Sequence, residues 1–263
     1  MLTSTQNNLV KKIRRLHSPK ERHKQGLFLI EGTHLIKEAC EVGYPLVNVC
    51  CTLQWQKNNQ VLWDDVCSQC NYADIVSQEV LNSIATTIQP NGIVATAMKR
   101  HDSMNIPLTG IAIALEAIQD PGNLGTIIRT SMAAGVAGLW VSRDSVDLDH
   151  PKVLRASAGQ WFHLPMAVSA DLRTTVKQAQ QAGMQVIASS PNTNLIYWEL
   201  DWQQPSLILL GNEGAGLSPD LSAIADFQVN IPLYPRVESL NVGVAGSLML
   251  YEALRQRSLQ MGN

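Results

Sequence analysis

The chain has 263 residues, a formal net charge of −2, 45% hydrophobic residues and 16% charged residues. This composition is typical of a globular protein with a sizeable core, and the length allows one large domain or two moderate ones. No apolar run reaches the roughly 20 residues of a membrane-spanning helix, and the polar start lacks the apolar core of a secretory signal. The five cysteines, an odd number, favour a reduced, intracellular protein. Together these features lead us to expect a cytoplasmic location and no membrane association.

The first hundred residues alternate between short helices and strands. Residues 77–84 have the pattern of a helix that Ser77 caps, with Val80, Leu81 and Ile84 facing inward. Further helices are expected at 7–17 and 33–42, and strands at 26–30, 47–53, 74–76 and 93–98. This alternation predicts a small α/β domain over residues 1–100.

Basic residues are concentrated between positions 11 and 24, where seven lysines and arginines accompany a single acid, Glu21. Such a local field can hold RNA phosphates by a salt-sensitive attraction that is independent of sequence. The alternative is a solvated helix face. The RNA contacts that we predict in this segment are Arg14, Arg15, Lys20 and Arg22.

The cysteines raise the question of a metal site. Cys67 and Cys70 form a lone C-x-x-C pair, which Cys50 and Cys51 could join around zinc. No second such pair and no spaced histidine pair accompanies them. We therefore expect free or buried thiols and no metal.

A polar segment, residues 99–107, is the expected linker, and a second series of elements follows it from residue 108 to 263. Residues 110–115 are continuously apolar, as in a strand that is buried on both faces. Helices are expected at 123–134, 172–182 and 240–257, and strands at 138–141, 185–188, 206–210 and 227–231. This order predicts a mostly parallel sheet with helices on both faces, whose ligands gather outside the carboxyl ends of the strands.

Three segments of the second half have unusual compositions. The first, DPGNLGTIIR at 120–129, follows a buried strand and opens a helix, so Asn123 can cap the helix while free N–H groups face an anion. Arg129 lies less than two turns further on and can face the same crevice. A capped helix with a surface arginine is the structural alternative.

The second segment, LLGNEGAGL at 209–217, has three glycines directly after an apolar strand, with Glu213 inside the turn. Glycine allows close backbone approach or positive φ, although a tight structural turn explains the pattern too. The third segment, residues 231–245, has two prolines before a helix of small residues, with Ser239 as a simple N-cap in the plainest interpretation.

In this order and spacing, the three segments resemble the motifs of the SpoU (TrmH-like) RNA 2′-O-methyltransferases of the SPOUT superfamily. The resemblance covers residues 110–257, including PKVLRASAG at 151–159, while residues 13–22 and 28–32 resemble less specifically the substrate-binding domain of two-domain members. It implies an α/β catalytic domain with a deep trefoil knot, a rare exception among folds, after a small L30e-like α/β domain. It also implies S-adenosylmethionine as cofactor, an RNA substrate and a homodimer that pairs through the knotted domain.

The resemblance also implies the roles of individual residues. The catalytic arginine corresponds to Arg129, and the site is completed by Asn123, Glu213, Ser239 and Asn241. Cofactor contacts, largely through the backbone, correspond to Gly211, Asn212, Gly214, Ile231, Leu233 and Leu240. Arg155 is an RNA contact by its motif position, offered by the partner subunit. Because arginine is a poor base, we expect Arg129 chiefly to orient a phosphate and stabilise the developing alkoxide, with proton removal by Arg129 as the alternative.

Two positions depart from the family pattern. Pro235 stands where the family usually has glycine, and Gly243 where serine or alanine is common. The first departure affects the loop over the cofactor, and the second affects helix packing. Neither removes a proposed catalytic group.

The expected function is transfer of a methyl group to a ribose 2′-hydroxyl, with ribosomal RNA favoured because a second, basic domain helps to grip a large folded substrate. Alternatives are a transfer RNA 2′-O-methyltransferase, a resistance enzyme that protects ribosomes from an antibiotic, and a non-catalytic RNA-binding protein with the knotted fold. The joint presence of the five polar site residues argues against loss of catalysis. A nicotinamide-dependent Rossmann enzyme would need G-x-G-x-x-G after its first strand, which the sequence lacks.

Overall fold

A computed structural model describes residues 1–99 and 106–261, with side chains as far as residue 258. The chain forms two compact units. The first contains the residues before the linker together with Asp147–His163, and the second contains the remainder. Most of the predicted linker, residues 100–105, lies outside the described residues.

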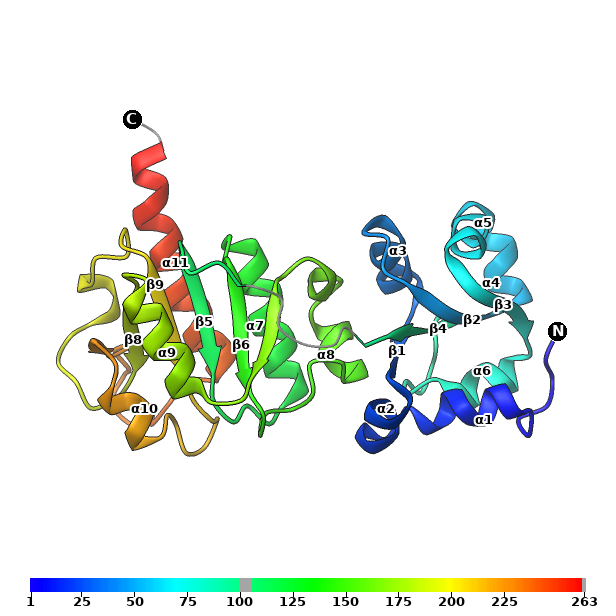
Figure 1. The fold of residues 1–263 in the computed structure, drawn as a ribbon, viewed down its shortest axis with the longest axis horizontal. Coiled ribbons are helices and arrows are strands. Elements are labelled where there is room, and N and C mark those ends of the chain that lie inside the picture. The colour runs from blue at the N-terminus through cyan, green and yellow to red at the C-terminus, as the bar shows by residue number, and fades with distance from the viewer. Residues whose placement is uncertain (100–105, 262–263) are drawn as a thin grey trace. The chain divides into compact units, whose positions relative to one another are not determined.

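The first unit is built on a four-stranded sheet in the order β1-β4-β2-β3 (Figure 1). β4 runs antiparallel to β1 and β2, and β3 is parallel to β2. The strands are β1 (Leu27–Glu31), β2 (Leu46–Thr52), β3 (Cys70–Val76) and β4 (Ile93–Met98). The helices are α1 (Asn8–Arg15), α2 (Pro19–Gln25), α3 (Thr33–Glu41), α4 (Leu53–Asn58), α5 (Gln60–Gln69) and α6 (Gln78–Ile84).

Apolar side chains cover both faces of this sheet. On one face, α1 and α6 pack over Leu29, Cys50 and Val94. On the other, α3 and α5 pack over strand residues that include Phe28 and Ile93. The predicted cap of α6 is confirmed, because the Ser77 side chain accepts a hydrogen bond from the backbone N–H of Val80.

The segment Asp147–His163 packs with the first unit, although its sequence position had placed it in the second predicted domain. It contains α8 (Pro151–Ala156) and a 3₁₀ turn, η1 (Gln160–Phe162). Leu154 and Phe162 join the core beneath α3, and the ring of Trp161 lies 5.2 Å from that of Phe28. The cap of α8 is His150, whose Nδ1 accepts the N–H of Lys152. Burial and the nearby charges of Arg22 and Arg155 lower the pKa of His150, which favours the neutral ring that a cap requires.

The second unit contains a six-stranded, wholly parallel sheet in the order β10-β8-β9-β5-β6-β7. Its strands are β5 (Ile111–Leu115), β6 (Gly138–Ser142), β7 (Met166–Ser169), β8 (Gln185–Ser189), β9 (Ser206–Leu210) and β10 (Phe227–Val229). Its helices are α7 (Pro121–Ala133), α9 (Leu172–Gln181), α10 (Pro219–Ala223) and α11 (Val242–Met261), with a 3₁₀ turn, η2 (Tyr197–Glu199).

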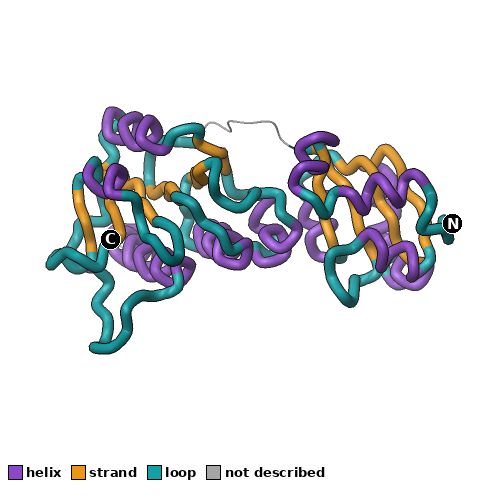
Figure 2. The backbone as a smooth tube through the Cα atoms, turned by 90° about the horizontal axis from the view of Figure 1, so that it is seen from below, coloured by secondary structure: helices purple, strands orange, loops and turns teal. Residues whose placement is uncertain are grey.

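Helices lie on both faces of this sheet, as predicted (Figure 2). α9 and α10 bury Leu207 and Leu209 of β9 on one face. On the other face α11 packs against α7, and Gly246 of α11 approaches Leu210 so closely that a Cβ there would lie 2.9 Å from its Cδ1. The central strands read as continuous apolar runs because both of their faces are covered.

Several local predictions require correction. Asn123 does not cap α7, because the helix begins earlier and the Asp120 side chain accepts the N–H groups of Gly122 and Asn123. Strand β10 ends at Val229 instead of residue 231, and Ser239 does not cap the terminal helix. α2, α4, α5, α8, α10 and β7 were not predicted. The trefoil knot stays a prediction.

The structure also bears on membrane-spanning helices, metal sites and the state of the cysteines. Among the residues that the structure describes, no helix is both long and apolar enough to cross a bilayer. Within the same residues, no group of three or more histidine, cysteine or acidic side chains could hold a metal ion. The five cysteines are free thiols, and burial raises the pKa of Cys50 and Cys51 to about 12.

Candidate active site

A cavity of about 560 Å³ lies in the second unit, at the carboxyl ends of β8, β9 and β10. It is lined by the ends of β8 and β9 and the residues after the three strands (189–192, 210–217, 230, 231, 233 and 238–240), by Pro219 and Ser222 of α10, and by the first turn of α11. The carboxyl ends of parallel strands share one edge of a sheet, so loops that are distant in sequence meet there. All six positions predicted to contact the cofactor line this cavity: Gly211, Asn212, Gly214, Ile231, Leu233 and Leu240.

The loop after β9 is a tight turn that Asn212 holds together. The backbones of Asn212 and Gly216 exchange two hydrogen bonds, of 3.0 and 2.9 Å. The Asn212 side chain accepts the N–H groups of Gly214 and Ala215 and donates to the carbonyl oxygen of Ala117 at 2.8 Å. Position 211 must be glycine, since a Cβ there would lie 2.1 Å from the carbonyl carbon of Gly216. The structural and ligand-binding interpretations of this segment are therefore compatible, because the turn forms the cavity wall.

The loop between β10 and α11 makes few backbone hydrogen bonds to the residues that the structure describes. Among the described residues, the only backbone hydrogen bond made by residues 231–240 is from the N–H of Val237 to the carbonyl of Tyr234, at 3.1 Å. That bond closes a turn in which Arg236 has a φ of +88°, a conformation usually reserved for glycine. Pro235 suits the preceding turn position because its ring fixes φ near −65°. The free N–H and C=O groups of the loop are available to a ligand in the cavity.

Three of the predicted catalytic residues form one hydrogen-bonded chain. Glu213 accepts the side-chain amide of Asn123 at 3.0 Å, and Asn123 accepts the side-chain amide of Asn241 at 2.8 Å. Glu213 also accepts the backbone N–H groups of Asp120 at 3.0 Å and Gln119 at 3.2 Å. These contacts connect all three motif segments.

The protonation state of Glu213 follows from these contacts. Partial burial raises its pKa, but the hydrogen bonds from Asn123 and from the backbones of Asp120, Glu213 and Gln119 together outweigh that effect. The net result is a lowered pKa, so the carboxylate is ionised at neutral pH, where these hydrogen bonds stabilise it.

Arg129 and Ser239 are not part of this chain. Arg129 lies on α7, exposed, and within residues 1–99 and 106–261 its guanidinium has no hydrogen bond or ion pair. Ser239 lines the cavity and is exposed. Among the described residues Arg129 is therefore an exposed cation without a partner, and neither Arg129 nor Asn123 is among the residues that line the cavity, so their expected approach to one crevice stays a prediction.

Asn241 has a second role at the start of α11. Its side-chain oxygen accepts the N–H groups of Gly243 and Val244, at 2.9 and 3.3 Å, so it caps the helix in place of Ser239. The small residue at 243 lies where α7 and α11 meet: a Cβ there would be 3.1 Å from Oδ1 of Asn241 and 3.3 Å from Cγ2 of Thr126. This departure from the family pattern thus affects helix packing, and it also relieves crowding at the cap.

The predicted RNA contacts of the first unit divide into two groups. Arg14, Arg15 and Lys20 are exposed. Arg22 is a correction, because its side chain is fully buried. It pairs with Asp147 at 2.7 Å and donates to the carbonyl oxygen of Leu16, so its guanidinium is a structural group that holds the segment Asp147–His163.

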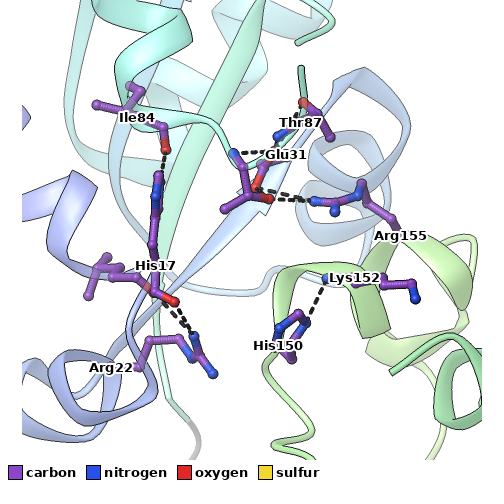
Figure 3. A network of polar contacts seen from close by, with 10 residues as sticks. His17, Arg22, Glu31, Ile84, Thr87, His150, Lys152 and Arg155 are labelled. Carbon is purple, nitrogen blue, oxygen red and sulfur yellow. Dashed lines mark hydrogen bonds and ion pairs between the residues drawn. The ribbon is translucent and has the colours of Figure 1, made fainter. Parts of the chain in front are cut away.

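Arg155 is also engaged within the first unit. Its guanidinium donates to Oγ1 of Thr86 at 2.8 Å and pairs with the buried carboxylate of Glu31 at 3.3 Å (Figure 3). Thr87 donates to the same carboxylate. Arg155 is about one-third exposed, so any RNA contact would have to use the edge that Glu31 leaves free.

Sequence reasoning missed two parts of the site. Residues 189–192 line the cavity, and their signal was present, because they follow a predicted strand whose end lies at the edge where ligands gather. Asp120 was overlooked as the cap because Pro121 at the first helical position, a common feature of helix starts, was not used to place the helix.

Comparison with known proteins places these features in a family. The profile of the SpoU rRNA Methylase family matches residues 110–251, and that of the MRM3-like substrate binding domain matches residues 7–95. The chain belongs to the SpoU rRNA methylase family. The predicted membership is thereby confirmed, and the first match covers the second unit's cavity and its hydrogen-bonded chain.

Individual relatives match over nearly the whole length. A tRNA/rRNA methyltransferase of Synechocystis is 44% identical, covering 97% of this chain and 94% of its own. The 23S rRNA (guanosine(2553)-2′-O)-methyltransferase RlmP of Bacillus subtilis is 30% identical, covering 95% and 97%. Among solved structures, the AdoMet-bound rRNA methyltransferase of Sinorhizobium meliloti matches with a TM-score of 0.86 and 29% identity, covering 97% of each chain. The SpoU methyltransferase AviRb of Streptomyces viridochromogenes matches with a TM-score of 0.85 and 27% identity, covering 97% and 99%.

Proposed function

We propose that this protein transfers a methyl group from S-adenosylmethionine to a ribose 2′-hydroxyl of ribosomal RNA. The observation that carries the proposal is the position of Glu213, which lines the cavity and also anchors the chain through Asn123 to Asn241. A ligand site and a polar cluster drawn from all three motif segments thus adjoin. Full-length similarity to RlmP, a 2′-O-methyltransferase of 23S rRNA, supports the choice of substrate.

The cavity suits S-adenosylmethionine in size and in chemistry. Its volume of about 560 Å³ falls within the usual range of small-molecule sites. Free backbone N–H and C=O groups of residues 231–240 can bind the polar edge of an adenine, and Leu217, Ile231 and Leu240 offer apolar contact to its faces. Because Gly211 has no Cβ, the turn after β9 can close tightly and form one wall of the cavity.

The residues around the cavity have distinct proposed roles. The cofactor supplies the methyl group. Gly211, Asn212 and Gly214 form the wall, and Ile231, Leu233 and Leu240 hold the cofactor through the opposite loop. Asn123, Glu213 and Asn241 fix the start of α7 against α11, while Ser239 offers a hydroxyl to the ligand. Arg129, which has no partner among the described residues, pairs with the phosphate next to the target ribose and orients its 2′-oxygen.

We also propose that the protein acts as a homodimer that pairs through α11. Val244, Leu248 and Tyr251 recur at helical spacing and are 47%, 37% and 53% exposed. Tyr234 and Val237 in the loop before the helix are exposed apolar side chains as well. An exposed apolar stripe of this kind is typical of a protein–protein interface.

The test is transfer of labelled methyl from S-adenosylmethionine to total RNA of a host that lacks this gene, followed by mapping of 2′-O-methyl sites. We expect one new site in ribosomal RNA from the wild type, and none from an Arg129→Ala variant that still binds the cofactor. Methylation of transfer RNA alone would replace the proposed substrate. Binding of RNA without methyl transfer to ribosomal RNA, to transfer RNA or to isolated ribosomal precursors would refute the enzyme and leave an RNA-binding protein.

A further inference from the structure

A second cavity, of about 430 Å³, lies in the first unit, whereas the candidate active site belongs to the second. It opens between α1 and α2 above the ends of β1, β2 and β4, and we name it the α1–α2 groove. Its lining residues are Lys12, Ile13, Arg15, Leu16, Glu21, Lys24, Gln25, Leu27, Asn48 and Thr96. All of these residues except Thr96 lie within the range that matches the MRM3-like substrate binding domain.

The groove is positively charged, and its charges are not neutralised. Lys12, Arg15 and Lys24 face one acid, Glu21, which leaves a local excess of positive charge. Among the described residues, none of these three cationic side chains has a hydrogen bond or an ion pair. The Glu21 carboxylate accepts the side-chain amide of Gln25 at 3.1 Å, and its single negative charge cannot balance three cations. Three free cations around one cavity form an attractive site for phosphate groups.

The floor of the groove is polar where the rest of that sheet face is apolar. Under α1 and α6 this face of the sheet consists of apolar side chains such as Leu29, Cys50 and Val94. Two residues along β2 and β4, toward the groove, the same face has Asn48 and the fully buried Thr96. The Asn48 side chain donates to Oγ1 of Thr96 at 2.9 Å, which fixes the orientation of the amide. Its Oδ1 and its second amide hydrogen have no partner among the described residues.

We propose that the α1–α2 groove binds one unpaired nucleotide of the RNA substrate, with its phosphates on Lys12, Arg15 and Lys24 and its base edge on Asn48. This proposal rests on the proposed function in that it names a contact of the same RNA. Asn48 presents a donor next to an acceptor, the arrangement with which asparagine pairs with base edges. The apolar side chains of Ile13, Leu16 and Leu27 offer a surface to the face of the base.

A single nucleotide fits the groove better than a duplex does. The volume of about 430 Å³ is that of a small-molecule pocket, and its floor lies beneath the flanking helices. Bases in a helical stem are paired and stacked, so only an unpaired base can reach a recessed amide. The groove therefore selects single-stranded over duplex RNA. Lys12 and Lys24 join Arg15 as RNA contacts.

The charge contribution is tested with fluorescein-labelled, mixed-sequence, single-stranded RNA of twelve nucleotides, in anisotropy titrations at several salt concentrations. Each lost phosphate contact should lower the slope of log affinity against log salt by about 0.7, so Lys12→Gln/Lys24→Gln should lower it by about 1.4. Lys57→Gln/Lys177→Gln changes the net charge equally at exposed positions outside the groove and should leave the slope unchanged. Equal slopes for the two double variants would overturn the proposal.

The base contact has a different signature. Asn48→Ala should weaken binding about fivefold, as expected for one lost hydrogen-bonding group, without changing the salt slope. Asn82→Ala, an exposed asparagine on α6, is the matched control and should bind as the wild type does. Melting temperatures of all variants establish that each is folded. Unlabelled duplex RNA of the same length should compete more weakly than single-stranded RNA, and equal competition would overturn the single-strand assignment.

The outcome separates this proposal from the proposed function. If the wild type methylates ribosomal RNA but the groove variants bind the labelled RNA as tightly as the wild type, the groove proposal fails alone. If the groove variants lose affinity as described but the wild type transfers no methyl group to any RNA, the enzyme proposal fails and the groove stands.

Discussion

A substitution of Gly211 by alanine tests whether the turn after β9 forms the cofactor site. The added Cβ would lie 2.1 Å from the carbonyl carbon of Gly216 and 2.2 Å from the N atom of Leu217. Carbon atoms pack at about 3.5 Å or more, so the backbone must move by more than about 1 Å. The neighbour is backbone instead of a flexible side chain, so rotation about a side-chain bond cannot relieve the clash.

This movement would break the two hydrogen bonds between Asn212 and Gly216. Two backbone hydrogen bonds contribute about 2 kcal/mol together, and overpacking costs about 1 kcal/mol or more. If the cofactor binds only to the undistorted cavity, this free-energy cost is subtracted from its binding free energy. S-adenosylmethionine should then bind at least about 100-fold more weakly, at 1.4 kcal/mol for each factor of ten. Isothermal titration calorimetry measures this affinity directly.

The matched control is Gly43→Ala in the first unit. Gly43 has a φ of +62° with nothing within 4 Å of the added Cβ, so alanine introduces about 1–2 kcal/mol of backbone strain without a clash. This variant should lose stability and keep wild-type affinity for the cofactor. Wild-type affinity in Gly211→Ala, or an equal loss of affinity in both variants, would refute the role of the turn.

Four further outcomes are expected. Arg129→Lys should keep cofactor affinity and lose methyl transfer by about a hundredfold, because lysine lacks the planar fork; full activity would refute the orienting role. Arg22→Met should cost about 3 kcal/mol in urea unfolding, whereas the exposed Arg14→Met should cost less than about 0.5 kcal/mol. The pKa of Glu213 is lowered on folding, so its ionised form stabilises the fold above the ordinary value of 4.5 and this contribution is lost as pH falls through the lowered pKa. The melting temperatures of wild type and Glu213→Gln should therefore differ at pH 7 and converge in acid. Leu248→Glu should convert the dimer to monomer in sedimentation velocity, and an unchanged dimer would move the interface elsewhere.

The elements that the sequence predicted well are those whose apolar pattern is decided by burial. β5 and β9 are continuous apolar runs because helices cover both faces, and α6 has both a cap and an inward face. The elements that were missed have weaker patterns. α5 mixes apolar and charged residues with little periodicity, and α2 consists largely of charged residues, so its signal was attributed to a basic surface.

The position of Asp147–His163 could not be predicted, because it depends on contacts that are distant in sequence. Arg22 and Asp147 are 125 residues apart, and the composition of the basic segment gives no sign that one of its seven cations is buried. Burial of a charged group is possible only where partners compensate its desolvation. Asp147 and Asp149, from the other half of the chain, supply those partners.

For the site, the family resemblance indicated residues that line the cavity, but only the fold reveals how the proposed catalytic residues are connected. The five polar residues were predicted as one set, yet the structure divides them by what their side chains already bind. Asn123, Glu213 and Asn241 use their polar atoms on one another and on the backbone. Sequence cannot distinguish such satisfied groups from free ones.

This division narrows the chemistry that each residue can perform. A general base must hold a free acceptor with a pKa near the working pH. The contacts of Glu213 oppose this role, since its carboxylate accepts hydrogen bonds from Gln119, Asp120 and Asn123 and its pKa is lowered. The carboxylate is better described as the anchor that holds the amino end of α7, through Asn123 and Asn241, against α11. Arg129, which has no partner among the described residues, is then the group of α7 that we propose to meet the RNA, and a guanidinium, which offers only hydrogen-bond donors, suits stabilisation of an anion instead of acceptance of a proton.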